Sequence, residues 1–300
     1  DRQEGSPGEE AGCRQSGREE GGREEGGSRE EGSGEEGTLS PVDPAGLLEL
    51  AVGLAHDAAT VLRQRPADLG VLSTKSSPTD VVTVMDRAAE RVILDGLAAA
   101  RPDDAIVSEE SGGSAGSSGV SWLVDPLDGT VNYLYGIPHY AVSIAAAIDD
   151  ATVCGVVVDV DRRLTYTAVA GAGSFADDVP IRCGDQSDPA FALVGTGFNY
   201  EVELRTKQAA AMSTVLPAVR DIRRAGSAAL DLCAVACGQL DAFFEAGMYP
   251  WDWAAGGLIA QEAGARVDGL AGNPPGRNTT LAANPALFDA LHELLVFSNL

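Results

Sequence analysis

The chain of 300 residues is 44% apolar and carries a formal net charge of −24. A chain of this length buries about 70–75% of the surface that it exposes when unfolded, so it can form a stable core without disulfides or metals. The excess of negative charge disfavours nucleic acid and anionic membranes as partners, because proteins that bind phosphate polymers carry an excess of Lys and Arg.

The first part of the chain differs in composition from the rest. REEGG occurs at 18–22 and again at 23–27, and REEGS follows at 29–33. Such a segment has too few apolar residues to offset the entropy lost on ordering, so we predict a disordered acidic Gly/Glu-rich tail over residues 1–39. Residues 1–37 supply −7 of the net charge, and −17 therefore remains on the rest of the chain. Docking to a partner or buffering of metal ions is the alternative role of the tail.

Two helices are expected at the start of the globular part. Apolar residues between 47 and 62 recur at helical spacing until Pro66 ends the pattern, and a second helix is expected over about 81–100, before Pro102. Short apolar runs then predict a series of strands. These strands are expected at 105–107, 122–124, 141–147, 152–158 and 164–169.

The second half of the chain mixes strands and helices in a different order. Strands are expected near 191–195 and 241–245, and helices near 202–216, 227–237, 252–263 and 285–296. This mixture predicts a layered α/β or α+β domain over residues 40–297 with two subdomains. The subdomains are expected at about 40–180 and 181–297.

Cysteine usage and hydropathy indicate a compartment. The five cysteines are odd in number and widely spaced, which favours reduced thiols over a disulfide framework. No uninterrupted apolar run reaches the roughly 18–20 residues of a membrane span, and the first forty residues lack the apolar core of a signal peptide. We therefore expect a cytoplasmic protein.

Two aspartates lie three residues apart in WLVDPLDGTVNYLYG, residues 122–136. Pro126 fixes its own φ, so a tight turn here can direct Asp125, Asp128 and the carbonyl of Leu127 toward one point. Three hard oxygen ligands within four residues suit Mg²⁺ or a similar cation. Asp, Pro and Gly are also common in turns that bind nothing, so this segment alone leaves both interpretations open.

The end of this stretch and two other segments add to the interpretation of this turn. Gly129 and Thr130 are expected to begin a short helix, whose free N–H groups can bind a phosphate. Upstream, Glu109 and Glu110 follow the strand expected at 105–107; downstream, Asp252 is expected at a helix N-terminus between two tryptophans. Each acidic segment has an ordinary explanation, since acidic strand ends are usually solvated and Asp is a common N-cap.

These motifs together resemble the inositol monophosphatase family of Mg²⁺-dependent, lithium-sensitive phosphatases. The resemblance rests on DPLDGT with the following VNYLYGIP, on SEES, on WDWAAGGLIAQEAG and on KSSPTDVVTVMD. It covers about residues 43–297 with all four motifs in order. It implies a layered αβαβα sandwich of the inositol monophosphatase and fructose-1,6-bisphosphatase type.

The resemblance implies a cluster of Mg²⁺ ligands. Glu109, Asp125 and the carbonyl of Leu127 would hold a first ion, while Asp125, Asp128 and Asp252 would hold a second; some relatives bind a third ion near Glu109. Carboxylates crowded in this way repel one another unless cations neutralise them. Two ions about 3.5–4 Å apart can activate a water and stabilise the leaving alkoxide.

Other roles are also implied by the resemblance. Catalysis is assigned to Glu109, Thr130 and Asp86, with Asp86 bonded to Thr130. Contacts to the substrate and its phosphate are assigned to Asp128, Gly129, Thr130, Ala228 and Glu245. Lys75 lies in the active-site loop of the motif. Tyr133 and Ala265 depart from the family pattern at positions that touch no metal.

The implied fold does not name the substrate, because fructose-1,6-bisphosphatases, 3′-phosphoadenosine nucleotide phosphatases and histidinol-phosphate phosphatases share it. Residues 223–252 most resemble the inositol-phosphatase branch, which favours myo-inositol 1-phosphate as the small-molecule substrate. A non-catalytic regulatory protein is the alternative of another class, but the four metal carboxylates are all present. Relatives are commonly homodimers, so a homodimer is expected.

Removal of residues 1–37 is expected to leave the rate of Mg²⁺-dependent phosphate release nearly unchanged, because the repeats lie outside every motif. The measurement compares the full-length and shortened proteins at equal concentration. A large loss of rate in the shortened protein would show that the tail helps to build the site.

Overall fold

The structure is a computed structural model, and it describes residues 42–66, 71–74 and 81–300. These residues belong to one unit, Val42–Leu300. The tail predicted at 1–39 and Lys75 lie outside the described residues.

Two long helices begin the unit, and each starts at a side-chain cap. In α1 (Pro44–Arg63), the carboxylate of Asp43 accepts from the N–H groups of Ala45 and Gly46 at 3.0 and 3.2 Å. In α2 (Val84–Ala100), Thr83 forms the N-cap. These bonds satisfy N–H groups that have no partner within the helix.

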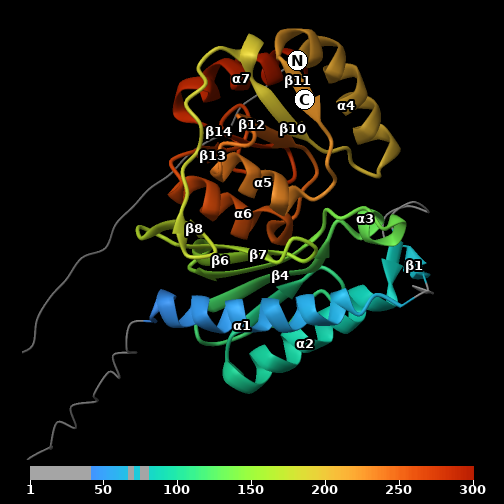
Figure 1. Cartoon of the computed structure of the whole chain (residues 1–300), viewed down its shortest axis with the longest axis vertical. Helices are drawn as coiled ribbons and strands as arrows, with labels where there is room; N and C mark the ends of the chain where they lie inside the picture. Colours follow the sequence, from blue (N-terminus) through green and yellow to red (C-terminus); the bar gives the residue numbers. More distant parts are fainter. Residues whose placement is uncertain (1–41, 67–70, 75–80) are drawn as a thin grey trace, which may run out of the picture. The chain divides into compact units, whose positions relative to one another are not determined.

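Seven strands form the larger sheet in the order β3-β4-β5-β6-β7-β8-β9, with β3 and β4 parallel and the other neighbours antiparallel. They are β3 (Ala105–Ser108), β4 (Val120–Asp128), β5 (Ala141–Ile148), β6 (Ala151–Asp159), β7 (Leu164–Val169), β8 (Gly173–Ala176) and β9 (Val179–Pro180). Helices α1 and α2 cover one face, and α5 (Ala228–Ala236) and α6 (Pro250–Glu262) cover the other (Figure 1). Because both faces are covered, the first seven residues of β5 are buried.

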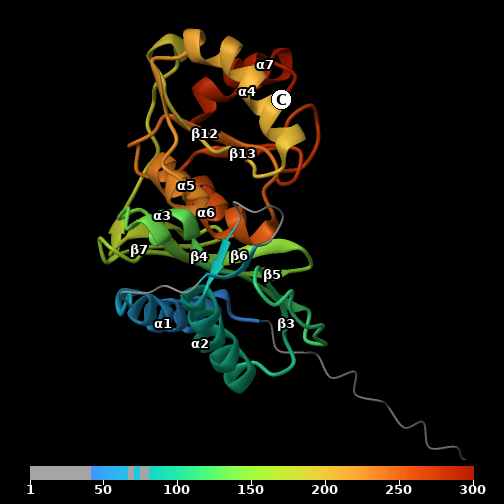
Figure 2. The same cartoon turned by 90° about the vertical axis from the view of Figure 1, so that its right-hand side faces the viewer.

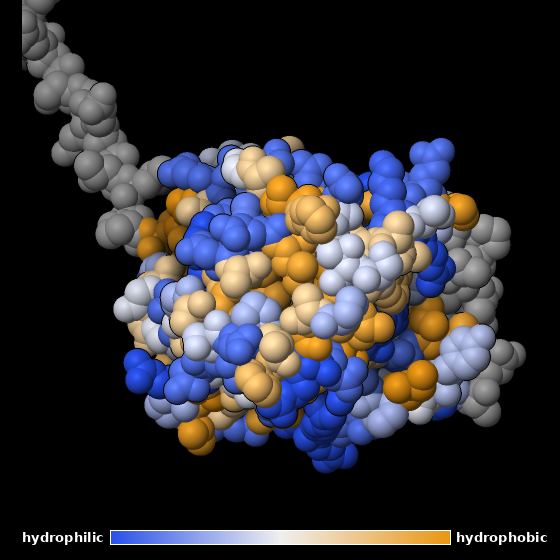
Figure 3. All heavy atoms as spheres, turned by 90° about the horizontal axis from the view of Figure 1, so that it is seen from above, coloured by the Kyte–Doolittle hydropathy of each residue, from blue (hydrophilic) through white to orange (hydrophobic). Residues whose placement is uncertain are grey.

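Five strands form the second sheet in the order β11-β10-β12-β14-β13. They are β10 (Leu193–Thr196), β11 (Asp221–Arg223), β12 (Ala242–Glu245), β13 (Arg266–Asp268) and β14 (Thr280–Ala283). Side chains along β12 alternate between two cores: Phe243 packs with α5 and α6, while Phe244 packs with α7 (Pro285–Phe297). The outer face formed by α4 (Val202–Val215) and α7 mixes apolar and polar residues (Figure 3).

The unit therefore has five layers: α1 and α2, the larger sheet, α5 and α6, the second sheet, and α4 with α7. Figure 2 shows this order from a second side. Helices α5 and α6 lie between the two sheets and contact both. The layered αβαβα sandwich is thus confirmed.

Several expected boundaries were wrong. Residues 81–83 form β2 (Val81–Thr83), not the first turn of a helix, because they pair with β1 (Val71–Thr74). The expected strand at 191–195 begins two residues later, after a 3₁₀ turn at Pro189–Phe191. The short strands β8, β9, β11, β13 and β14 were not expected, since runs of two to four residues show no clear period.

The turn expected after residue 124 is also wrong in detail. β4 continues to Asp128, with Asp125 opposite Ser143 and Asp128 opposite Ala141 on β5. The two pairs are three residues apart on β4 but only two residues apart on β5, so β4 contains a β-bulge here. The short helix expected after Gly129 is present as α3 (Thr130–Tyr135).

Helix α1 has the length and composition of a membrane span, with a mean hydropathy of 1.4 over its most apolar part. No other helix among the described residues has both properties. Length and composition are weak evidence, because core helices of soluble proteins pass the same test. Seven residues of α1 are buried within the fold. Its apolar residues are thus explained by packing against α2 and the larger sheet.

Gly155 on β6 is expected not to tolerate a side chain, because a Cβ there would lie 2.8 Å from Cα of Ala255 on α6. Gly155→Val should lower the free energy of unfolding by about 1–3 kcal/mol, the usual cost of overpacking. Urea denaturation followed by circular dichroism measures the change. Gly53 on α1 is the control, since a Cβ there meets nothing within 4 Å; Gly53→Ala should raise the same quantity by about 0.5–1 kcal/mol. Equal stability of both variants would contradict the close packing of α6 on β6.

Candidate active site

Nine of the eleven site residues predicted from sequence line one cavity of about 510 Å³. They are Glu109, Asp125, Leu127, Asp128, Gly129, Thr130, Ala228, Glu245 and Asp252. Asp86 does not line the cavity but is bonded to Thr130, and Lys75 lies outside the described residues. Segments far apart in sequence therefore meet at one place, as the resemblance implies.

The bulge of β4 arranges the middle of this site. Asp125 is buried, and one of its carboxylate oxygens accepts from the backbone N–H of Leu127 at 3.0 Å. Gly129 follows the strand with φ +95°, and a Cβ there would lie 3.1 Å from the carbonyl oxygen of His139. Glycine is therefore required where β4 turns into α3.

Asp128 links β4 to the N-terminus of α5. Its Oδ2 accepts from Oγ of Ser227 at 2.6 Å and from the backbone N–H of Ala229 at 2.8 Å. Burial, together with the weaker effect of the Glu109 and Asp231 charges, raises the pKa of Asp128 to about 6, against the lowering effect of its two hydrogen bonds. Donors at a helix N-terminus stabilise a carboxylate that burial would otherwise keep protonated.

Asp252 has a similar position in α6. It was expected at the N-terminus of a helix, with an N-cap as its ordinary explanation; the cap residue is Tyr249, and Asp252 lies in the first turn. The helix starts earlier than expected because Pro250 is well suited to the first helical position. Oδ2 of Asp252 accepts from the backbone N–H of Tyr249 at 2.7 Å. Burial, followed by the charge of Glu109, raises the pKa of Asp252 well above its usual range.

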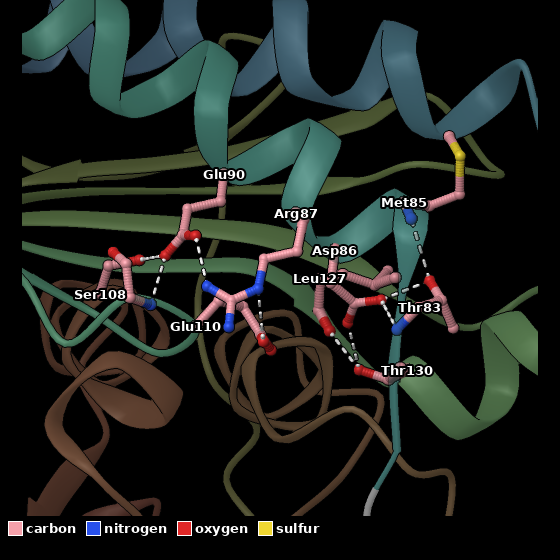
Figure 4. A network of polar contacts seen from close by, with 10 residues as sticks. Thr83, Met85, Asp86, Arg87, Glu90, Ser108, Glu110, Leu127 and Thr130 are labelled. Atoms are coloured by element: carbon pink, nitrogen blue, oxygen red, sulfur yellow. Dashed lines mark hydrogen bonds and ion pairs between the residues drawn. The ribbon is translucent and has the colours of Figure 1, made fainter. Parts of the chain in front are cut away.

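Both carboxylate oxygens of Asp86, in the first turn of α2, accept hydrogen bonds (Figure 4). Its Oδ2 accepts from the backbone N–H of Thr83 at 2.9 Å and from the hydroxyl of Thr83. Its Oδ1 accepts from Oγ1 of Thr130 at 2.9 Å, and Thr130 also lies 3.1 Å from the carbonyl oxygen of Leu127. The hydroxyl of Thr130 is thus oriented from α2 and β4 together.

The next turn of α2 holds the segment that carries Glu109 (Figure 4). Oε1 of Glu90 accepts from Oγ of Ser108 at 2.6 Å and from the backbone N–H of Ser111 at 2.9 Å. Arg87 pairs with Glu90 at 3.3 Å and with Glu110 at 3.8 Å. These contacts fix the residues on both sides of Glu109. Sequence reasoning did not single out Glu90, whose only signal was its place one turn after Asp86.

Glu245 ends β12 at the other side of the cavity. A Cβ on Gly197 would overlap its carboxylate, so glycine leaves the room that Glu245 occupies. Burial, against the opposing charge of Arg224 and with a smaller effect of Asp128 and Asp231, raises the pKa of Glu245 to about 8. Arg224 and Asp231 also line the cavity and were not predicted. Their signal was the cluster of charges around the glycine and serine before α5.

The donor set fits a hard divalent cation. As the side chains stand, no three His, Cys, Asp or Glu side chains in the described part of the chain are grouped closely enough to hold one metal ion. Asp128 and Asp252 each have one oxygen bonded to a backbone N–H. The candidate ligands are all oxygen atoms, and the raised pKa values of Asp128 and Asp252 reflect a buried, mutually repelling group. A divalent cation would relieve this repulsion.

Comparison with known proteins identifies the family. The model of the inositol monophosphatase family matches residues 43–299. The chain belongs to the inositol monophosphatase family. Inositol-1-monophosphatase SuhB of Mycobacterium tuberculosis is 47% identical over 271 residues, which are 83% of this chain and 93% of that protein. The protein named Nus factor SuhB of Pasteurella multocida is 41% identical over 226 residues, 74% of this chain and 84% of that one.

The fold agrees with this assignment. The solved structure of Mycobacterium tuberculosis SuhB superposes with a TM-score of 0.74 at 44% identity and covers 86% of this chain and 98% of that one. The resemblance that the four motifs indicated is therefore confirmed at the level of family and fold. Family membership supports a phosphatase activity. Other relatives are named Nus factor SuhB, which is not the name of an enzyme.

Glu245→Gln should stabilise the metal-free protein at alkaline pH. The pKa of Glu245 is raised from 4.5 to about 8, so the unfolded chain binds fewer protons between these values and stability falls as pH rises through this window. When the pH is raised from 5 to 9, the free energy of unfolding of the variant should rise by roughly 2–4 kcal/mol relative to that of wild type. This is less than the full pKa shift would give, because the cavity is open to water.

Urea denaturation in EDTA at both pH values measures this difference. Glu49→Gln on α1 is the control, because Glu49 is exposed and outside the cavity, and its stability should follow that of wild type. Parallel pH profiles of wild type and Glu245→Gln would contradict the buried position of the Glu245 carboxylate.

Proposed function

We propose that the chain is a Mg²⁺-dependent phosphomonoesterase that hydrolyses myo-inositol 1-phosphate and related polyol phosphates to the alcohol and phosphate. The observation that carries this proposal is the meeting of Glu109, Asp125, Asp128 and Asp252 in one cavity, next to a Thr130 hydroxyl oriented by Asp86. Family membership supports it, since this family is generally metal dependent.

The ligands of the ions are proposed residue by residue. Two or three Mg²⁺ ions would be held by Glu109, Asp125, Asp128, Asp252 and the carbonyl of Leu127. When bound, the ions lower the pKa of a water and neutralise the leaving alkoxide. Asp125 is central, because the proposal makes it a ligand of two ions at once.

Thr130 and Asp86 orient the attacking water in this proposal. Both neighbours of the Thr130 hydroxyl, Oδ1 of Asp86 at 2.9 Å and the carbonyl of Leu127 at 3.1 Å, are acceptors. The hydrogen of Thr130 is therefore donated to one of them, and the lone pairs of its oxygen remain to accept from a water. A water held in this way would keep a lone pair free on the side away from Thr130, which could attack a bound phosphate.

The phosphate and the alcohol have separate proposed contacts. Gly129 and Thr130 line the cavity at the start of α3, where backbone N–H groups would bind phosphate oxygens. Ala228 and Glu245 would contact the alcohol, with Glu245 accepting from its hydroxyls. Arg224 and Asp231, of opposite charge, both line this side, so charge alone does not select between one phosphate and two. We favour polyol monophosphates because residues 223–252 resemble the inositol-phosphatase branch.

A fructose-1,6-bisphosphatase, a nucleotide bisphosphate phosphatase and a histidinol-phosphate phosphatase remain the alternative enzymes. A regulatory role is a second candidate, favoured by the relatives named Nus factor SuhB. The net charge of −24 speaks against direct binding of nucleic acid in that role. A cytoplasmic location, a homodimer and sensitivity to lithium stay predictions.

The direct test is a substrate panel. The purified protein is supplied with Mg²⁺ and with inositol 1-phosphate, fructose 1,6-bisphosphate, a 3′,5′-bisphosphonucleotide or histidinol phosphate, and released phosphate is measured. We expect the highest kcat/KM for inositol 1-phosphate. Release of phosphate from none of the four would overturn the enzyme proposal and leave the regulatory role.

Asp125→Asn should abolish turnover at saturating inositol 1-phosphate, because it removes a charge that the proposal shares between two ions. Phosphate release is measured over a series of Mg²⁺ concentrations. Asp95→Asn is the matched control: Asp95 is exposed on α2 and does not line the cavity, so its rate should equal that of wild type. A rate for Asp125→Asn above about a tenth of wild type would mean that the ligand assignment is wrong, since a buried ligand carboxylate contributes more than tenfold.

A further inference from the structure

One side of the cavity is built from three loops that Arg277 joins. Arg277 precedes β14, and its guanidinium donates to the carbonyl oxygen of Gly247 at 2.8 Å and lies 3.4 Å from Oε1 of Glu201. The backbone N–H of Gly247 donates in return to the carbonyl of Arg277 at 2.9 Å. Arg277, Gly247 and Glu201 all line the cavity. The loop before α4 and the loop between β12 and α6 are thus tied to the loop before β14.

Arg277 also lies against an aromatic pair. Its guanidinium carbon lies 4.3 Å from the ring centre of Tyr249, and the same ring stacks on Trp251 at 4.8 Å with 10° between the planes. The buried Nε1 of Trp251 has no hydrogen-bond partner among the described residues, so stacking and packing hold this indole.

Tyr249, whose ring contacts both Arg277 and Trp251, is hydrogen-bonded to Asp252 through its backbone. The backbone N–H of Tyr249 donates to Oδ2 of Asp252 at 2.7 Å, and the N–H of Asp252 donates to the carbonyl of Tyr249 at 3.1 Å. The placement of the Tyr249 backbone therefore decides where the Asp252 carboxylate points. Arg277 fixes that backbone twice, through the ring of Tyr249 and through the carbonyl of Gly247 two residues earlier.

The exposure of Arg277 separates this role from a contribution to global stability. Its side chain is 48% exposed, and an exposed ion pair such as that with Glu201 contributes about 0–1 kcal/mol. Arg277 instead contacts the segment that precedes Asp252, through the carbonyl of Gly247 and the ring of Tyr249. A guanidinium can donate to a carbonyl, face a carboxylate and stack on a ring at the same time, which an ammonium group cannot do.

We propose that Arg277 is a positioning residue which, through Tyr249 and Gly247, orients the carboxylate of Asp252 for binding a divalent cation. The proposal rests on the function proposed above, because Asp252 is a metal ligand only in that function. Removing the outer partner of a metal ligand typically weakens metal binding about 10–100-fold. The expected effect is therefore a lower affinity of the metal-free protein for Mg²⁺, which is measured without substrate.

The experiment titrates the metal-free, full-length protein with MgCl₂ alone by isothermal titration calorimetry, in parallel with the Mg²⁺ dependence of phosphate release. Arg277→Gln and Tyr249→Leu should each weaken Mg²⁺ binding at least about tenfold, and the double variant should be no weaker than either one, because both act through one contact. Tyr249→Phe keeps the ring and should bind Mg²⁺ as wild type does. Arg277→Lys should not restore affinity.

Arg266→Gln is the matched control. Arg266 pairs with Asp289 at 3.0 Å and with Asp268 at 3.2 Å, lies 4.0 Å from the ring centre of Phe288, and is also 48% exposed. It does not line the cavity, so its loss removes contacts of the same kind without reaching Asp252. Mg²⁺ affinity of Arg266→Gln should equal that of wild type.

Three results would overturn the proposal. Mg²⁺ affinity within twofold of wild type in both Arg277→Gln and Tyr249→Leu would remove the link to Asp252. An equal loss of affinity in Arg266→Gln would show a general effect of lost surface contacts. Failure of both Arg277→Gln and Tyr249→Leu to fold, judged by circular dichroism, would make the contact structural. If wild type itself binds no Mg²⁺, the proposed function fails first, and the two failures are thereby distinguished.

Discussion

Negative charge buried in one cavity is the constraint on which the rest of this site depends. Burial and the charge of Glu109 raise the pKa values of Asp128 and Asp252, so each carboxylate makes the next one harder to ionise. The fold offsets part of this cost with helix N-termini. Asp128 accepts from the first turn of α5, Asp252 lies in the first turn of α6, and Asp86 is bonded in the first turn of α2. A divalent cation would offset the remainder, which connects the electrostatics to the proposed chemistry.

The layered fold is what brings these helix ends to one place. Helices α5 and α6 lie between the two sheets, and Gly155 allows α6 to approach β6 closely. The bulge in β4 lets Asp125 and Asp128 stay on one strand while the chain turns into α3. Around this centre, α2 orients Thr130 and holds the segment of Glu109, while Arg277 supports the segment of Asp252 on the opposite side. The reactive groups are thus held by bonds that reach beyond the cavity.

Sequence reasoning succeeded where the physical signal is local. The cores of the long helices followed from apolar spacing and from prolines, and the five layers followed from the motifs that place the chain in its family. It failed where pairing decides the structure. Residues 81–83 form a strand because they pair with β1. Arg224 and Asp231 stayed unnoticed, since the charges around the glycine and serine before α5 do not show by themselves which side chains face a cavity.

By itself, the sequence determined the family, the layered fold class and the acidic residues that lie at the site, because motifs and periodicity are properties of short stretches of chain. Only the tertiary structure decided how those residues are held. The bonds of Asp128 to α5 and of Arg277 to Gly247 each join segments more than 25 residues apart. Such contacts form only when the layers pack, so spacing along the chain carries no record of them.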